Sequence, residues 1–356
     1  MFQLWTGCQR RGQSLQSDAF GLTAGPDSVS LPTPQELRSY SRCQLCPRAC
    51  GVDRLAGERG LCGETATPRL GAITAHAGEE PPISSLRGSG TFFFSGCGVR
   101  CFFCQNGQIA FEGLGRVYTW QSLYAAALRL VAQGVHNLNF VTPAPHWPTV
   151  AWLSRVLREA GCTLPRIANC SGHHEVRNVM AFAQDIDIFL PDFKYAFPEL
   201  AAECMGDHRY PELALAAIET MITARGFLMP FDETGRVPAQ CGVMVRHLVL
   251  PGELENSLRT LRLLRARFGR HLPLAVMSQF TPQPACQARG RFARRVTGAE
   301  YSAVVIEAER LGFESLLIQA PTPDEHFVPD FKKAQPFDRF PVGLHSVAQE
   351  EPGPAP

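Results

Sequence analysis

The stretch Phe92–Gln108, FFFSGCGVRCFFCQNGQ, decides how the chain is interpreted, because it holds three closely spaced cysteines: Cys97, Cys101 and Cys104. This spacing would place the three thiols on one face of a helix, where free cysteine packs as a small apolar residue. However, Gly96, Gly98 and Gly107 interrupt the stretch, and glycine is a poor residue for a helix interior. The aromatic run before it is typical of a strand, so the stretch predicts a strand that ends in a cysteine-bearing loop.

Three thiols in one loop indicate a metal site. A four-iron cubane takes four ligands, so three cysteines leave one iron open to a substrate or cofactor. We refer to residues 97–104 as the cysteine loop.

The cysteine loop, with Phe103 directly before Cys104, resembles the cluster loop of the radical S-adenosylmethionine (radical SAM) superfamily. The resemblance is closer to a branch of uncharacterised proteins related to pyruvate formate-lyase activating enzyme. It covers the chain from about Cys43 to Gln319 and departs at Gly98, where that branch commonly has Asn. The stretches that carry it are Cys46–Val52 (CPRACGV), Gly78–Ile83 (GEEPPI), Leu190–Tyr195 (LPDFKY) and Val245–Gly252 (VRHLVLPG).

The resemblance implies an enzyme with one 4Fe–4S cluster on the three cysteines and S-adenosylmethionine on the open iron. Reductive cleavage of that cofactor gives a 5′-deoxyadenosyl radical, and the implied use is abstraction of hydrogen from a glycine on a partner protein. An electron donor such as flavodoxin or ferredoxin is implied as well. The alternative is radical modification of a small molecule or peptide, and a non-catalytic iron–sulfur or zinc protein ranks last.

Four further residues are candidates for binding S-adenosylmethionine: Phe103, Asp192, Lys194 and Arg246. Phe103 would stack on the adenine or simply pack in the core. Strand alternation puts Asp192 and Lys194 on one face, as a cofactor-binding pair or as a surface ion pair. By resemblance, Arg246 points inward and binds the cofactor carboxylate.

One family feature is missing. Many radical enzymes hold the methionine amine with a Gly-Gly-Glu-Pro turn, and Thr142-Pro143 stands in its place here. The sequence therefore does not identify the group that binds the methionine amine, and Thr142 is named only because it occupies this position.

A second group of cysteines lies upstream: Cys43, Cys46, Cys50 and Cys62. The glycine-rich segment around them has too few apolar residues to form a core, so it needs a cross-link such as a metal site or a disulfide in order to fold. Four thiolates suit zinc or a second cluster, and these alternatives stay open. Disulfides or free thiols are the remaining possibility.

Strand-like and helix-like segments alternate through the rest of the chain. Strands are expected at 91–95, 137–141, 166–169, 186–190, 243–250, 274–278 and 315–319. Helices are expected at 121–133, 149–160, 175–183, 198–204, 211–224, 254–267 and 299–311. This pattern predicts an α/β fold, a partial parallel (β/α)6-type barrel with a small cysteine-rich N-terminal segment.

The carboxyl ends of such strands meet at one mouth, where active sites of barrels lie. We therefore expect convergence of the polar residues that follow the strands: Cys97, Cys101, Cys104, Thr142, His146, Asn169, Ser171, His173, Asp192, Lys194, Arg246, His247, Gln279 and Gln319. The long, basic stretch 280–295 follows a strand on the same side and is expected to serve as a lid or docking loop.

Composition narrows the function class. The net charge of +1 and the lack of aromatic residues among the arginine runs argue against nucleic acid as a partner. No apolar run approaches the length of about 20 residues needed to cross a bilayer, so no membrane segment is expected. Seven of the 13 cysteines lie between Cys43 and Cys104, which indicates metal binding in a reducing cytoplasm.

Four segments are expected along the chain: a poorly ordered lead-in at 1–39, a cysteine-rich segment at 40–88, a radical SAM core at 89–331 and a tail at 332–356.

Overall fold

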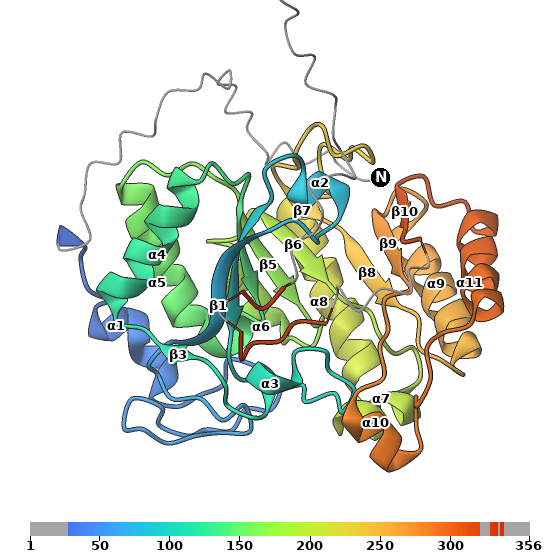
Figure 1. The fold of residues 1–356 in the computed structure, drawn as a ribbon, viewed down its shortest axis with the longest axis horizontal. Coiled ribbons are helices and arrows are strands. Elements are labelled where there is room, and N and C mark those ends of the chain that lie inside the picture. The colour runs from blue at the N-terminus through green and yellow to red at the C-terminus, as the bar shows by residue number, and fades with distance from the viewer. Residues whose placement is uncertain (1–27, 321–327, 334, 338–356) are drawn as a thin grey trace, which may run out of the picture.

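The computed structural model describes residues 28–320, 328–333 and 335–337 of the 356-residue chain. It has a mixed α/β fold with helices around a largely parallel arc of strands (Figure 1). The seven-stranded sheet has the order β3-β1-β2-β4-β5-β6-β7, and a three-stranded sheet has the order β10-β9-β8.

The parallel arc begins at β2 (Ser89–Phe94), and every expected strand is present. After β7 the sheet is interrupted at Met244, and an isolated parallel bridge between Asp192 and Arg246 links the two sheets. The predicted partial parallel barrel is therefore confirmed. The remaining parallel strands are β4 (Leu138–Val141), β5 (Arg166–Cys170), β6 (Ile188–Pro191), β7 (Gly242–Val243), β8 (Val245–Leu248), β9 (Leu274–Met277) and β10 (Leu316–Ile318).

The seven expected helices are also present, and two of them begin at threonine caps. The side chain of Thr119 accepts a hydrogen bond from the Ser122 amide, and Thr297 forms a capping box with Glu300. These helices are α4 (Trp120–Ala132), α5 (Trp147–Glu159), α6 (Val176–Phe182), α7 (Pro198–Met205), α8 (Tyr210–Arg225), α9 (Leu254–Phe268) and α11 (Gly298–Arg310). Figure 1 shows α4 and α5 toward one end of the arc and α9 and α11 at the other.

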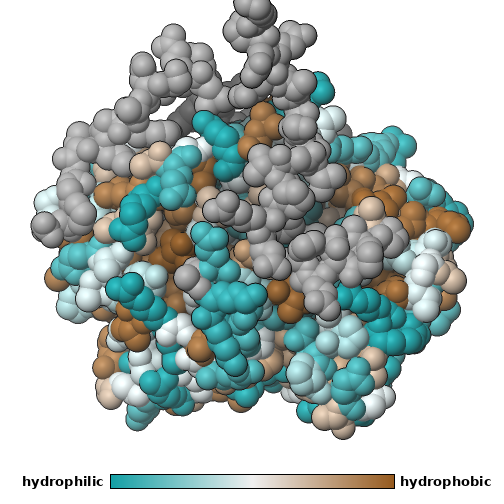
Figure 2. All heavy atoms as spheres, viewed as in Figure 1, coloured by the Kyte–Doolittle hydropathy of each residue, from teal (hydrophilic) through white to brown (hydrophobic). Residues whose placement is uncertain are grey.

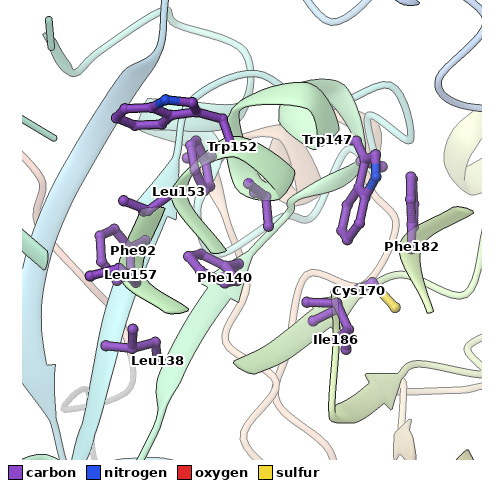
Figure 3. Packing of buried hydrophobic residues seen from close by; sticks show 14 of the residues in the cluster. Phe92, Leu138, Phe140, Trp147, Trp152, Leu153, Leu157, Cys170, Phe182 and Ile186 are labelled. Atoms are coloured by element: carbon purple, nitrogen blue, oxygen red, sulfur yellow. The ribbon is translucent and has the colours of Figure 1, made fainter. Parts of the chain in front are cut away.

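The core lies between the strands and the helices that cover them. All residues of β2, β4 and β6 are buried, because a parallel sheet is covered on both faces. Near α5, the ring of Trp147 stacks on Phe182 at a centroid distance of 3.8 Å, and Trp152 and Leu153 pack toward Phe92 (Figure 3). This packing fixes the strands whose ends form the site.

The antiparallel strand β1, which lies between β3 and β2, was not predicted from the sequence. β1 (Arg69–His76) pairs antiparallel with β2, and β3 (Arg116–Val117) pairs with the start of β1. The strand β1 carries the chain into α2 (Pro81–Ser84), and so brings Gly78–Glu80 to the mouth of the arc. The other short elements are α1 (Pro34–Leu37), the 3-10 turns Arg38–Tyr40 and Ala144–His146, α3 (Gly107–Ala110) and α10 (Pro284–Arg289).

The expected division into four segments stays a prediction. Residues 1–27 of the lead-in and 338–356 of the tail lie outside the described residues. Residues 28–39 contain α1, and Ser30 accepts a hydrogen bond from the indole of Trp152 at 2.8 Å. Among the described helices, none combines the length and apolar character that a bilayer crossing requires. On the visible face, outside the grey atoms, hydrophilic and hydrophobic residues are interspersed (Figure 2).

Candidate functional site

One pocket at the carboxyl ends of the parallel strands gathers most of the predicted site residues. It encloses about 1270 Å³ of empty space, counted with its opening to solvent. Its lining includes Cys97, Cys101, Phe103, Cys104, Thr142, Asn169, Ser171, Asp192, Lys194, Arg246 and Gln279.

Four of the expected polar residues do not line this pocket. His146 is buried and contacts the Ser95 carbonyl oxygen at 2.7 Å. His247 points away toward α9, where its Nε2 lies 2.9 Å from the Ser257 hydroxyl. His173 lines a neighbouring cavity, and Gln319 donates to the side chain of Gln279 at 3.0 Å.

The cysteine loop is a series of turns rather than a helix, as the glycines predict. Gly96 has a φ of +79°, and a β-carbon there would lie 2.3 Å from the Glu64 side chain. Only glycine fits this close approach in the left-handed region. The turn carries the chain from the end of β2 into the pocket wall.

The thiols of the cysteine loop lie close enough to affect one another's ionisation. Burial raises the pKa of Cys101 to about 11 and that of Cys104 to about 12, with Cys97 adding to both shifts and Lys194 opposing them. A bound metal centre would supply the positive charge that stabilises the thiolates. The donor set therefore suits a thiolate-ligated cluster.

Within the part of the chain that the structure describes, no three Cys, His, Asp or Glu side chains are arranged to hold a single metal ion. A cubane makes a different demand, since each thiolate binds its own iron.

Tyr195 contacts this donor set and was missed as a site residue. Its hydroxyl oxygen lies 3.3 Å from the sulfur of Cys101, and burial raises the pKa of Tyr195 well above its usual value. The phenol therefore stays protonated and can donate to a thiolate. The stretch LPDFKY contained this residue, but nothing in the sequence showed that it meets Cys101.

Phe103 combines both of its expected environments. It lines the pocket, and its ring also packs edge-on against Phe102, Tyr195, Phe280 and Phe292 at centroid distances of 5.4–6.5 Å. Stacking on an adenine stays a prediction.

Asp192 and Lys194 leave β6 on the same face and form an ion pair, with 16% and 17% of their side chains exposed. Burial alone would lower the pKa of Lys194, but Asp192 and Cys101 raise it above its usual value. The lysine therefore keeps its positive charge beside the thiols. The pair lines the pocket, so it is not the exposed surface pair that was the alternative.

Arg246 points into the pocket, as the resemblance implies, and its guanidinium forms ion pairs with two carboxylates, Glu79 and Glu80. Glu79 also accepts hydrogen bonds from the side-chain amides of Asn139 at 2.8 Å and Asn169 at 3.3 Å. The role of Arg246 in binding a cofactor carboxylate stays a prediction. Glu79 and Glu80 were missed as site residues, since only their place in the stretch GEEPPI singled them out.

Thr142 follows β4 in a left-handed conformation, with a φ of +58°, and its amide donates to the carbonyl oxygen of Asn169 at 3.0 Å. A β-branched residue at positive φ is strained, and such strain is common at functional sites. Its link to the methionine amine stays a prediction.

Two segments distant in sequence complete the surroundings of the pocket. Phe280 and Phe292 pack on Phe103, so the stretch 280–295 contacts the cysteine loop, and its role as a lid or docking loop stays a prediction. Near the C-terminus, Phe337 lines the pocket and lies against Phe93 at a centroid distance of 4.9 Å.

The four upstream cysteines are also brought together. Cys43, Cys46, Cys50 and Cys62 line a separate cavity beside the cysteine loop.

Comparisons with known proteins place the chain beside one curated relative and several solved structures. No family model matches the chain. An uncharacterized protein of Methanocaldococcus jannaschii is 24% identical over 302 residues, which cover 81% of this chain and 80% of the relative. That relative's description assigns no activity.

The similar solved structures are methylornithine synthase, spore photoproduct lyase, and Streptococcus suis SuiB bound to S-adenosylmethionine. Their TM-scores are 0.42, 0.41 and 0.40, at 17%, 13% and 11% identity. The matches cover 62%, 62% and 67% of this chain, and 60%, 73% and 49% of those chains. All three scores lie below 0.5, and we take none of them as evidence of function.

Proposed function

We propose that this chain is a radical SAM enzyme, with a 4Fe–4S cluster on Cys97, Cys101 and Cys104 and S-adenosylmethionine in the adjoining pocket. The observation that carries the proposal is the opening of all three thiols into one pocket with Asp192, Lys194 and Arg246. When bound, the cluster and cofactor supply one-electron cleavage of a sulfonium C–S bond, which releases methionine and a 5′-deoxyadenosyl radical that abstracts hydrogen.

The residues of the chain have distinct tasks in this proposal. Cys97, Cys101 and Cys104 bind the irons, and the hydroxyl of Tyr195 donates to the sulfur of Cys101. The ammonium of Lys194, held by Asp192, offers a positive charge to the cofactor carboxylate.

Arg246 lines the same pocket and offers a second positive charge to the cofactor carboxylate, and its ion pairs with Glu79 and Glu80 fix its position. Phe103 presents an apolar surface to the adenine, and the packing of Phe280 and Phe292 behind it keeps water from the loop.

For the substrate, we propose a glycine on a partner protein, which would make the chain an activating enzyme. The opening of the pocket to solvent supports admission of a polypeptide loop. Radical modification of a small molecule or peptide is the alternative. The electron would come from flavodoxin or ferredoxin, in the reducing cytoplasm that the cysteine content predicts.

The first experiment is an assay for reductive cleavage. Anaerobically reconstituted protein with a strong reductant and S-adenosylmethionine should form 5′-deoxyadenosine and methionine in equal amounts. The Cys101→Ala variant should form neither, while the Cys162→Ala variant, which loses a buried thiol outside the pocket, should match the parent. Equal product from the parent and the Cys101→Ala variant would refute the proposal.

The substrate is tested separately. Reduced enzyme and S-adenosylmethionine are added to two lysates of the source cells, one unlabelled and one from cells grown with deuterated glycine. A glycyl doublet in the electron paramagnetic resonance spectrum is expected in the unlabelled lysate. In the deuterated lysate the doublet should collapse and deuterium should enter 5′-deoxyadenosine. Label that comes only from small molecules would favour the alternative.

A further inference from the structure

The upstream cysteines form a small cavity of their own. Cys43, Cys46, Cys50 and Cys62 line about 330 Å³ of space not filled by atoms, counted with its opening to solvent. The other lining residues are Leu45, Arg48, Ala49, Val52, Arg54, Gly60, Gly98 and Pro145.

The local backbone turns the four side chains toward one another without a helix or strand. The Cys43 amide donates to the Val52 carbonyl at 3.0 Å, and the Gly51 amide donates back to the Cys43 carbonyl at 2.9 Å. The Leu61 amide points at the sulfur of Cys50 at 3.4 Å, a contact that stabilises a thiolate. A β-carbon on Gly60 would lie 2.8 Å from the same sulfur, so glycine is required there.

The side chains of two arginines place positive charge beside this cavity. Arg54 is 1% exposed, its Nη1 lies 4.0 Å from the sulfur of Cys43, and its Nε has no hydrogen-bond partner within the described part of the chain. Arg48 donates only to backbone carbonyls there, including Gly98 at 2.8 Å and Val99 at 3.3 Å.

The Arg54 guanidinium donates to the carbonyl oxygens of Pro145 and Thr65, which carry no net charge. A buried guanidinium is costly without a nearby negative charge, and four protonated thiols provide none. A metal centre bound by four thiolates is net negative, because four thiolate charges exceed the charge of the metal core. The negative charge of such a centre would compensate the positive charges of the two arginines.

The cavity adjoins the cysteine loop. A β-carbon on Gly98, the residue after Cys97, would lie 3.0 Å from the sulfur of Cys46. Cys46 and Cys97 also line a common small cavity with His174, a fully buried histidine whose ring nitrogens have no partner within the described residues. Cys50, which also lines the four-cysteine cavity, is exposed. The site therefore spans from the surface to the wall of the proposed active site.

We propose that Cys43, Cys46, Cys50 and Cys62 bind a second 4Fe–4S cluster that passes electrons to the cluster on the cysteine loop. Zinc would balance the same charge but has no redox chemistry, and among the described residues no three Cys, His, Asp or Glu side chains are arranged to hold a single metal ion. The presence of the second cluster is independent of the proposed function, and only its role as a relay depends on it.

The proposed relay moves one electron in two steps. A reduced flavodoxin or ferredoxin gives one electron to the second cluster from the Cys50 side. That cluster then gives the electron to the cysteine-loop cluster through the contact between Cys46 and Gly98 and is itself reoxidised.

Metal analysis tests the second cluster. After anaerobic reconstitution the parent should bind about eight irons and eight sulfides, and the variant lacking all three loop cysteines about four of each. The Cys46→Ala/Cys50→Ala variant should also keep about four, and the Cys162→Ala control about eight. One zinc and no iron in the loop-deficient variant would overturn the proposal, as would a metal-free variant with four titratable thiols. The milder Cys50→Ser variant serves if the double variant does not fold.

The relay is tested by the rate at which the cysteine-loop cluster is reduced, followed by rapid-freeze electron paramagnetic resonance. In the Cys46→Ala/Cys50→Ala variant, the rate with reduced flavodoxin relative to dithionite should fall at least tenfold from its value in the parent. An unchanged ratio would refute the relay and leave the second cluster standing. This measurement needs no cofactor cleavage, so failure of the proposed function would be seen separately.

Discussion

The hydroxyl oxygen of Tyr195 lies 3.3 Å from the sulfur of Cys101, although 94 positions separate the two residues. Hydrogen bonds to cluster sulfurs help to set the reduction potential, because they stabilise the more negative, reduced state. Tyr195 is therefore a positioning residue that should tune the cluster.

We expect the Tyr195→Phe variant to keep its iron and to have a more negative reduction potential at the cysteine-loop cluster. A redox titration monitored by electron paramagnetic resonance measures the shift. Tyr301→Phe is the control, since Tyr301 donates to the carbonyl of Val276 and does not line the pocket. Equal potentials in the two variants would show that the Tyr195 hydroxyl does not act on the cluster.

Replacement of Lys194 by Met should weaken binding of S-adenosylmethionine by about tenfold or more, since a hydrogen bond to a charged group contributes about 1.5–3 kcal/mol. The apolar stem of the side chain is kept, so the cluster should be retained. Equilibrium dialysis with the reconstituted protein measures the affinity. Arg267→Met, at an exposed position on α9, removes a positive charge elsewhere and should bind as the parent does. If the Lys194→Met variant binds S-adenosylmethionine as tightly as the parent, the ion pair between Lys194 and Asp192 has a structural role and does not bind the cofactor.

Replacement of Arg246 by Met should destabilise the fold by about 3–5 kcal/mol, because it leaves Glu79 and Glu80 buried without their cation. Urea unfolding at pH 7 measures the loss. Arg262→Met, which breaks a more exposed pair with Glu307, should cost about 1 kcal/mol or less. Similar losses in the two variants would contradict the importance of the buried network.

The same variant should reverse a pH dependence. In the parent, burial raises the pKa of Glu79, but Arg246 and the hydrogen bonds to the carboxylate lower it to below its usual value near 4.5. The resulting stability is present above about pH 4.5 and is lost as the pH falls further. Loss of Arg246 removes the largest of the effects that oppose burial, while those of His76 and Asn139 remain. We therefore expect the pKa of Glu79 to rise above its usual value, so stability should increase from pH 7 to pH 5. A variant that loses stability over this range would show that Arg246 does not control Glu79.

Replacement of Thr142 by Gly should stabilise the protein by about 1 kcal/mol, because glycine tolerates the φ of +58° that strains a β-branched residue. Thr142→Ala keeps the β-carbon and should gain less. Thermal or urea unfolding of the metal-free protein compares the two variants. If Thr142→Gly is the less stable, side-chain contacts of Thr142 outweigh its backbone strain.

The parallel strands could be predicted because each is a short apolar run that is buried on both faces, as in β4 and β6. The strand β1 could not, since Leu70 is its only buried residue and its place depends on antiparallel pairing with β2. The convergence of Asp192, Lys194 and Arg246 followed from their positions after or within such strands. The pairing of Glu79 with Arg246 did not follow, because 167 positions separate them and only the folded chain brings them together.

The last described residues lie at the pocket, with Phe331 buried beside Phe93 and Phe337 in the pocket lining. The Phe331 amide donates to the side chain of Gln108 at 2.7 Å, and that side chain donates in turn to Asp330 at 3.2 Å. Gln108 lies in α3, directly after the cysteine loop. Shortening the gene before Asp330 would therefore remove Phe337 from the pocket lining and the contacts that hold Gln108, and a proteolytic cut near residues 328–337 is expected to have the same effect. An expression design that keeps residues 328–337 protects the cysteine loop as well.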